Sequence, residues 1–171
     1  MIGKKVEDAI NRQINAELYS AYLYLSMNAY FHSVSLAGFA NWMRVQALEE
    51  FTHADKFYGY LVSRGGRVKL AAVAAPPSAW KSPLNAFEEV LKHEQKVTAL
   101  INGLVDLSLK EKDHATGSML TWFVDEQVEE ESNADSLVGQ LRLMGDSGHG
   151  LYLMDKELSA RVFVPPIQAQ P

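Results

Sequence analysis

The residues that could carry chemistry are ionisable side chains set inside apolar helical patterns. Glu17 and Glu94 each interrupt a stretch of apolar residues, Glu50 and His53 form a Glu-x-x-His pair, and a fourth stretch reads Gln127-Val-Glu-Glu130. Residues three apart lie on one face of a helix, so Glu50 and His53 can reach the same point. Four separate segments therefore each offer at least one metal-ligand side chain near its middle.

Several carboxylates in an apolar core are costly, because each loses its hydration and the charges repel one another. A bound cation removes both penalties. Carboxylate and imidazole ligands suit iron or manganese and leave positions open for oxygen. The pattern predicts a paired metal site in which Glu50 bridges two ions, Glu17 and His53 complete one position, and Glu94 and Glu130 complete the other.

Each of these residues also has an ordinary interpretation. A single Glu-x-x-His pair on a helix is usually solvated, Glu17 could lie at a helix edge, and Glu94 could belong to an exposed run from His93 to Gln95. Taken one at a time, the ordinary interpretation is the commoner one. Four helices that each supply a suitable residue near mid-helix favour the metal site.

Long helices are needed to position these residues. Apolar residues at spacings of three and four predict a helix over about 6–31. Ser35 could cap a second helix that ends near Ser63, where Gly65-Gly66 supplies a left-handed stop. Ser82-Pro83 reads as the cap and first residue of a third helix that ends near Glu111.

The remaining segments complete an all-α fold. Asp113 could cap a fourth helix that runs to about Leu143. A loop is then expected at Gly145, Gly148 and Gly150. A short fifth helix is expected over about 151–161, before an extended tail at 164–171. Residues 67–82, with Pro76-Pro77, predict a long crossover between the second and third helices. One long crossover is typical of ferritin-like four-helix bundles, so the prediction is a single domain over 1–171 with its bundle at about 6–143.

The composition limits the classes of function. The chain has 171 residues, 47% apolar and 22% charged, with a net charge of −5. This charge disfavours nucleic acid and suits cationic partners such as metal ions. The absence of cysteine excludes disulfides, zinc–thiolate sites and iron–sulfur clusters. The first residues lack the pattern of a signal peptide and no apolar run is long enough to span a membrane, so a soluble, cytoplasmic protein is expected.

Several longer motifs resemble those of non-haem ferritins of bacteria and archaea. They include the stretch Asn11 to Tyr24, Gly38-Phe-Ala-Asn-Trp-Met, Glu49-Glu-Phe-Thr-His-Ala, Arg64-Gly-Gly-Arg-Val, Pro76-Pro-Ser-x-Trp80, and Trp122-Phe-Val-Asp-Glu-Gln-Val-Glu-Glu-Glu131. The resemblance extends from about Val6 to Arg161.

The resemblance implies roles for particular residues. The resemblance implies that Glu17, Glu50 and His53 hold the first iron. It implies that Glu50, Glu94 and Glu130 hold the second iron, with Gln127 beside them. A third iron position matches Glu49, Glu126, Glu129 and Glu130. Tyr24 matches a tyrosine that lies beside the di-iron site and is thought to supply an electron; a buried core tyrosine is the equal alternative.

Departures from related families narrow the assignment. Gln127-x-x-Glu130 stands where bacterioferritins and rubrerythrins carry a second Glu-x-x-His motif, and Phe51 stands where bacterioferritins place the methionine that binds haem. No haem is therefore expected. The lack of cysteine removes the rubredoxin-type centre of rubrerythrins, and the expected fifth helix disfavours the starvation-induced mini-ferritins.

The resemblance implies a ferroxidase that stores iron. The expected particle is a homo-oligomer of twenty-four subunits in a hollow shell, which oxidises Fe(II) with dioxygen or hydrogen peroxide and keeps the Fe(III) mineral inside. Two alternatives have the same ligands: a stand-alone di-iron oxidoreductase or peroxidase that stores nothing, and a helical metal buffer that does not accelerate oxidation. No nucleic acid or membrane is expected as a partner.

Overall fold

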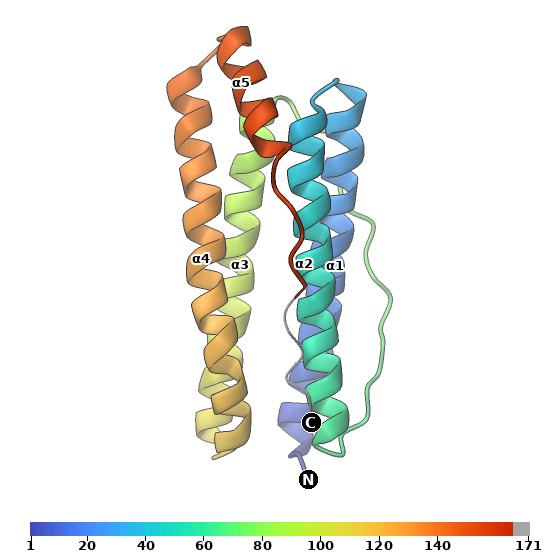
Figure 1. Cartoon of the computed structure of the whole chain (residues 1–171). Coiled ribbons are helices and arrows are strands. Elements are labelled where there is room, and N and C mark those ends of the chain that lie inside the picture. Colours follow the sequence, from blue (N-terminus) through green and yellow to red (C-terminus); the bar gives the residue numbers. More distant parts are fainter. Residues whose placement is uncertain (166–171) are drawn as a thin grey trace.

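The computed structural model describes residues 1–165, so most of the expected tail at 164–171 lies outside the described residues. The described residues form five helices: α1 (Lys4–Ser33), α2 (Ala37–Ser63), α3 (Pro83–Lys110), α4 (His114–Met144) and α5 (Gly148–Leu158). Figure 1 shows the first four side by side as a bundle, with α5 across one end. The all-α prediction is confirmed. Of the described helices, none is both long and apolar enough to cross a membrane.

The connection between α2 and α3 sets the topology of the bundle. It runs along the outside of α1 and α2 for most of the bundle's length, so α3 starts at the same end as α2 (Figure 1). Two asparagines of α1 hold it: Asn11 donates to the carbonyl oxygen of Arg67 at 3.0 Å and accepts from the amide of Lys69 at 2.6 Å, and Asn15 donates to the carbonyl oxygen of Ala72 at 3.2 Å. The predicted long crossover is confirmed.

Several predicted helix ends are also confirmed. The Ser82 hydroxyl accepts from the Asn85 amide at 3.1 Å, and the Asp113 carboxylate accepts from the Thr116 amide at 3.1 Å. These contacts satisfy amides that the first turn of a helix leaves free. Gly65, at φ 70°, closes α2 in the left-handed conformation as expected.

Two expectations about turns are wrong. Ser35 does not cap α2, which begins after Leu36. Ser35 instead has φ 61° and is the left-handed residue that closes α1, where the amide of Leu36 bonds to the Phe31 carbonyl at 3.0 Å. The expected glycine loop is shorter than predicted, because Gly148 and Gly150 lie within α5. The cause is Ser147, whose hydroxyl accepts from the Gly150 amide at 3.1 Å and starts the helix early.

The core consists of two apolar clusters. One, toward the α5 end, contains Tyr24, Phe31, Phe39, Phe87 and Met154 among others. The second, toward the chain's N-terminal end, gathers the side chains Ile10, Ile14, Phe57, Leu104, Leu120 and Phe123. On each of the four long helices, a buried polar side chain lies between the residues that supply the two clusters: Glu17 on α1, Glu50 on α2, Glu94 on α3 and Glu130 on α4. The bundle thus places a polar layer between the two apolar clusters.

A close contact fixes α5 on the start of α2. The Asp155 carboxylate accepts from the amides of Gly38 and Phe39 at 2.7 and 3.1 Å. A carboxylate at a helix N-terminus satisfies free amides and interacts favourably with the helix dipole. A Cβ atom on residue 38 would lie 1.6 Å from the Asp155 carbonyl oxygen, so only glycine permits this approach.

Candidate metal centre

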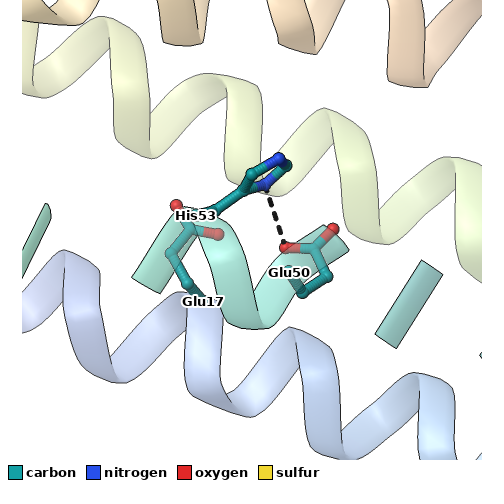
Figure 2. Close-up of side chains that lie close together, drawn as sticks. All are labelled: Glu17, Glu50 and His53. Carbon is teal, nitrogen blue, oxygen red and sulfur yellow. Dashed lines mark ion pairs between the residues drawn. The ribbon is translucent and has the colours of Figure 1, made fainter. Parts of the chain in front are cut away.

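The centre of the polar layer is formed by Glu17 of α1 with Glu50 and His53 of α2. One ligand atom from each of these three side chains lies within 4.8 Å of the other two, and all three side chains are buried. His53 Nδ1 lies 3.6 Å from Glu50 Oε2. Figure 2 shows Glu17 reaching from α1 toward the two residues of α2, with the dashed line between His53 and Glu50. The i, i+3 spacing on α2 places both side chains on one face.

Two carboxylate oxygens at this centre have no hydrogen-bond donor. Across residues 1–165, Glu17 Oε2 and Glu50 Oε2 are the buried side-chain polar atoms without a hydrogen-bond partner. A buried polar atom without a partner costs the free energy of its lost hydration. Both orphaned atoms belong to carboxylates beside His53, and this donor set fits a divalent metal ion.

Glu94 of α3 is buried and accepts hydrogen bonds from two side chains. It accepts a short hydrogen bond from the Tyr24 hydroxyl, and Gln127 Nε2 donates to Glu94 Oε2 at 3.3 Å. Gln127 also lies 3.3 Å from the Thr98 hydroxyl. In this arrangement the side-chain nitrogen of Gln127 faces Glu94 and is hydrogen-bonded to its carboxylate.

Glu130 of α4 is joined to Glu50 through a glutamine. Gln46 Nε2 donates to Glu130 Oε2 at 2.8 Å and lies 3.5 Å from Glu50 Oε1. Among the described residues, only the first set (Glu17, Glu50 and His53) brings three ligand atoms within 4.8 Å of one another. The second expected set (Glu50, Glu94 and Glu130) is more widely spaced. Its carboxylates have protein donors instead: Tyr24 and Gln127 donate to Glu94, and Gln46 donates to Glu130.

Burial changes the protonation of these carboxylates. Desolvation, reinforced by the negative charge of neighbouring glutamates, raises the pKa of Glu17 and Glu50 well above the ordinary value of 4.5. Desolvation also raises the pKa of Glu94, and it raises that of Glu130 to about 8 with the help of the charge on Glu94. The centre therefore favours either bound protons or a bound cation.

The third expected position, formed by Glu49, Glu126 and Glu129 with Glu130, lies at the edge of the layer. Glu126 Oε1 is 3.9 Å from His53 Nε2, and Glu129 is exposed. Desolvation raises the pKa of Glu49; the charge of Arg161 opposes this, while Glu126 and Glu129 add to it. Arg161 Nη2 donates to Glu49 Oε2 at 2.5 Å. The structure thus gives Glu49 a protein cation as its partner.

Residue patterns alone did not reveal three side chains that hold the ligands. Gln13 donates to Glu17 Oε1 at 2.8 Å, and Gln46 donates to both Glu50 and Glu130. Both glutamines precede a predicted ligand by four residues, a helical spacing that could have identified them. Arg161 comes from a segment 112 residues away from Glu49, and no local pattern connects the two.

Comparison with known proteins identifies the fold family. A family model described as a ferritin-like domain matches residues 7–144. The bacterial non-heme ferritin of Bacteroides fragilis strain 638R is 43% identical over 161 residues, which are 94% of this chain and 100% of that protein. That of Staphylococcus saprophyticus is 44% identical over 163 residues, 95% of this chain and 98% of that protein.

Solved archaeal structures agree with these matches. An engineered closed form of the Archaeoglobus fulgidus ferritin superposes with a TM-score of 0.95 at 55% identity, covering 96% of this chain and 100% of that one. A novel open pore ferritin from the same hyperthermophilic archaeon gives a TM-score of 0.94 at 56% identity, covering 95% and 100%. The chain belongs to the ferritin family, as a non-haem ferritin of the bacterial and archaeal type.

Proposed function

We propose that this protein is a ferroxidase that oxidises Fe(II) at the buried centre and stores the Fe(III) product. The observation that carries the proposal is the pair of orphaned oxygens, Glu17 Oε2 and Glu50 Oε2, beside His53 in a buried layer. Iron storage is the property of the family to which the chain belongs. The oxidation step is the specific activity proposed for this chain.

The charges at the centre suit two Fe(II) ions. Glu17, Glu50, Glu94 and Glu130 are all buried and together carry four negative charges when ionised. Two divalent ions neutralise them, which offsets the desolvation and repulsion that raise their pKa values. Glu50 lies between the other ligands: it is close to Glu17 and His53, and Gln46 joins it to Glu130. It is therefore the residue proposed to bridge the two ions.

Oxidation needs two electrons delivered together. Each Fe(II) gives one electron, and dioxygen with two protons becomes hydrogen peroxide, or peroxide with two protons becomes two waters. The protein positions the ions and neutralises charge, while the redox chemistry belongs to iron. We propose that Tyr24, which is hydrogen-bonded to Glu94, supplies a further electron to the oxidant. Tyr24, Gln46 and Gln127 donate hydrogen bonds to the carboxylates proposed for the second ion, which suits iron that passes through.

Storage requires an assembly, and one face of the chain supports it. A mainly apolar groove lies between α1, α2 and the crossover, and its lining consists of Ile14, Leu18, Phe51, Ala54, Asp55, Tyr58 and Leu70. Phe51 is 60% exposed and Leu70 is 67% exposed in the single chain. An exposed apolar surface of this kind marks a site of protein contact. We propose that further copies of the chain cover it in a shell of twenty-four subunits, and that Glu49, Glu126 and Glu129 lie on the path of iron leaving the centre.

A double substitution tests the oxidation step. The variant Glu50→Ala with His53→Ala removes the bridging carboxylate and the imidazole, and its initial rate of aerobic Fe(II) oxidation should fall by at least about tenfold. The rate is followed by the near-ultraviolet absorbance of Fe(III). The matched control is Glu89→Ala with Lys92→Ala, an exposed pair at the same i, i+3 spacing. The assignment is wrong if the first variant oxidises Fe(II) as fast as the wild type.

A further inference from the structure

Arg161 connects the segment after α5 to the edge of the metal centre. Its guanidinium donates from Nη2 to Glu49 Oε2 at 2.5 Å and from Nη1 to Gln46 Oε1 at 2.9 Å. The same group lies 4.6 Å from the centre of the Trp42 ring. A planar guanidinium that donates to two acceptors and stacks on an aromatic ring is held in one orientation.

The backbone that carries Arg161 is anchored on α2. Asn41 Nδ2 lies 3.1 Å from the Leu158 carbonyl oxygen and 2.9 Å from that of Arg161. In Figure 1 the segment after α5 turns back along α2. Asn41 of α2 and Arg161 of the segment therefore fix this stretch of chain beside the ligand-bearing helix.

Arg161 also sets the orientation of Gln46. Arginine can only donate hydrogen bonds, so the side-chain atom of Gln46 that faces it must be the oxygen. The Gln46 nitrogen then points the other way, toward Glu130 Oε2 at 2.8 Å and Glu50 Oε1 at 3.5 Å. Because Gln46 is fully buried, water does not offer it alternative partners. The arginine on the C-terminal segment thus acts on the centre through one buried amide.

We propose that Arg161 is a positioning residue whose guanidinium holds Glu49 in the metal-free protein, and that a metal ion bound by Glu49 competes with it and loosens the segment after α5. The inference rests on the proposed function in that Glu49 receives metal. A guanidinium and a metal ion on one carboxylate repel each other, so the two partners oppose each other's binding. Thermodynamic linkage makes the effect reciprocal: the contact between Arg161 and Glu49 weakens metal binding, and metal binding weakens that contact.

The test uses Zn(II), which does not change oxidation state and accepts carboxylate and imidazole ligands. Assembled, metal-free, full-length protein is titrated by calorimetry, and amide hydrogen exchange is measured over residues 159–165. In the wild type, zinc bound beyond about two ions per chain should speed exchange in this segment by about fivefold or more. In Arg161→Met the segment should already exchange fast without zinc, and the weaker class of zinc sites should tighten by about fivefold or more.

Two further variants separate competition from a general loss of packing. Arg161→Lys keeps the positive charge and should retain most of the competition with zinc, although it loses the paired contact with Glu49 and Gln46. Glu49→Gln leaves Arg161 in place but removes its charged partner. The segment should then exchange faster than in the wild type without zinc, and zinc should no longer change its exchange.

The outcomes distinguish this inference from the proposed function. Two results would overturn the inference while the first zinc ions still bind as expected. One is that the weaker zinc sites in Arg161→Met keep their wild-type affinity; the other is that zinc leaves the exchange of the wild-type segment unchanged. Either result would mean that Arg161 does not compete with metal. If the wild type lacks the first, tight class of sites altogether, the proposed metal centre itself is wrong, and the inference falls with it.

Discussion

Burial controls the protonation of the carboxylates at the centre of the bundle. Desolvation is the largest cause of the raised pKa of Glu17, Glu50, Glu94 and Glu130. Four donors moderate the effect: Gln13 for Glu17, Tyr24 and Gln127 for Glu94, and Gln46 for Glu130. No comparable donor reaches Glu17 Oε2 or Glu50 Oε2 among the described residues. The two orphaned atoms are therefore the positions at which a cation relieves the largest cost.

This predicts that the metal-free protein loses stability as pH rises. The pKa of Glu130 is about 8 in the folded chain, against an ordinary value of 4.5. Between these values the folded state keeps a proton that the unfolded chain releases, so the free energy of unfolding falls as pH rises. The contribution is present below pH 4.5 and is lost as pH rises through about 8. Each such group contributes at most about 1.4 kcal/mol per pH unit.

Thermal unfolding of the metal-free protein across this pH range checks the prediction. Glu130→Gln, which cannot ionise, should show a shallower decline than the wild type. Saturating Zn(II) should reverse the trend, because metal ions bind deprotonated carboxylates and compete with protons. A metal-free wild type whose stability rises steadily from pH 5 to pH 8 would contradict the assignment of these carboxylates as buried and protonated.

Among the elements, α5 and the start of α2 depend on each other. Asp155 of α5 supplies the N-terminal cap that α2 lacks in its own sequence, since Leu36 at the cap position has no suitable side chain. Gly38 makes the approach possible by having no Cβ atom. The segment that follows α5 carries Arg161, which contacts Gln46 and Glu49. The absence of a Cβ atom at Gly38 thus permits α5 to pack closely on the start of α2.

Gly38→Ala should therefore destabilise the docking of α5. The added Cβ would lie 1.6 Å from the Asp155 carbonyl oxygen, so the backbone of α5 must move. Overpacking of this kind costs about 1–3 kcal/mol, and it should lower the thermal midpoint of the metal-free protein. The matched control is Gly103→Ala in α3, where nothing lies within 4 Å of the new atom. That control should be neutral or slightly stabilising, and equal midpoints for the two variants would refute the packing argument.

At the scale of the whole molecule, the centre lies between two apolar clusters that hold the helices in register. The cluster with Phe31, Phe39 and Phe87 fixes one end, and the cluster with Phe57 and Phe123 fixes the other. Rigid packing on both sides keeps ligands from four helices within reach of one another. The exposed groove between α1 and α2 then faces outward as the surface proposed for assembly. Storage is a property of that assembly rather than of one chain.

Aerobic loading with Fe(II) tests storage directly. Metal-free protein is given excess Fe(II) in air and separated by gel filtration, and iron is counted in the protein peak. We expect a very large particle that carries far more than about two iron atoms per chain, the capacity of one di-iron site. About two atoms per chain in a small particle would instead indicate a stand-alone di-iron enzyme. A large particle that holds iron without accelerating its oxidation would indicate a buffer.

Much of the fold could be predicted from local patterns. The caps at Ser82 and Asp113, the stop at Gly65 and the crossover over 67–82 depend on neighbours in the chain, and each is present in the structure. Ser35 shows the limit of this approach. A serine before an apolar run can begin the next helix or end the previous one. In the three-residue turn between α1 and α2, Ser35 ends α1.

The ligand types and their spacing along each helix follow from the order of residues alone, because helical periodicity fixes which side chains share a face. The sequence therefore predicted Glu17, Glu50 and His53 as one group, and the structure brings their ligand atoms within 4.8 Å of one another. Three other contacts appear only once the helices are packed: Tyr24 with Glu94, Gln46 with Glu130, and Arg161 with Glu49. These contacts join residues from different helices, and their geometry depends on how the helices pack, which no local spacing encodes.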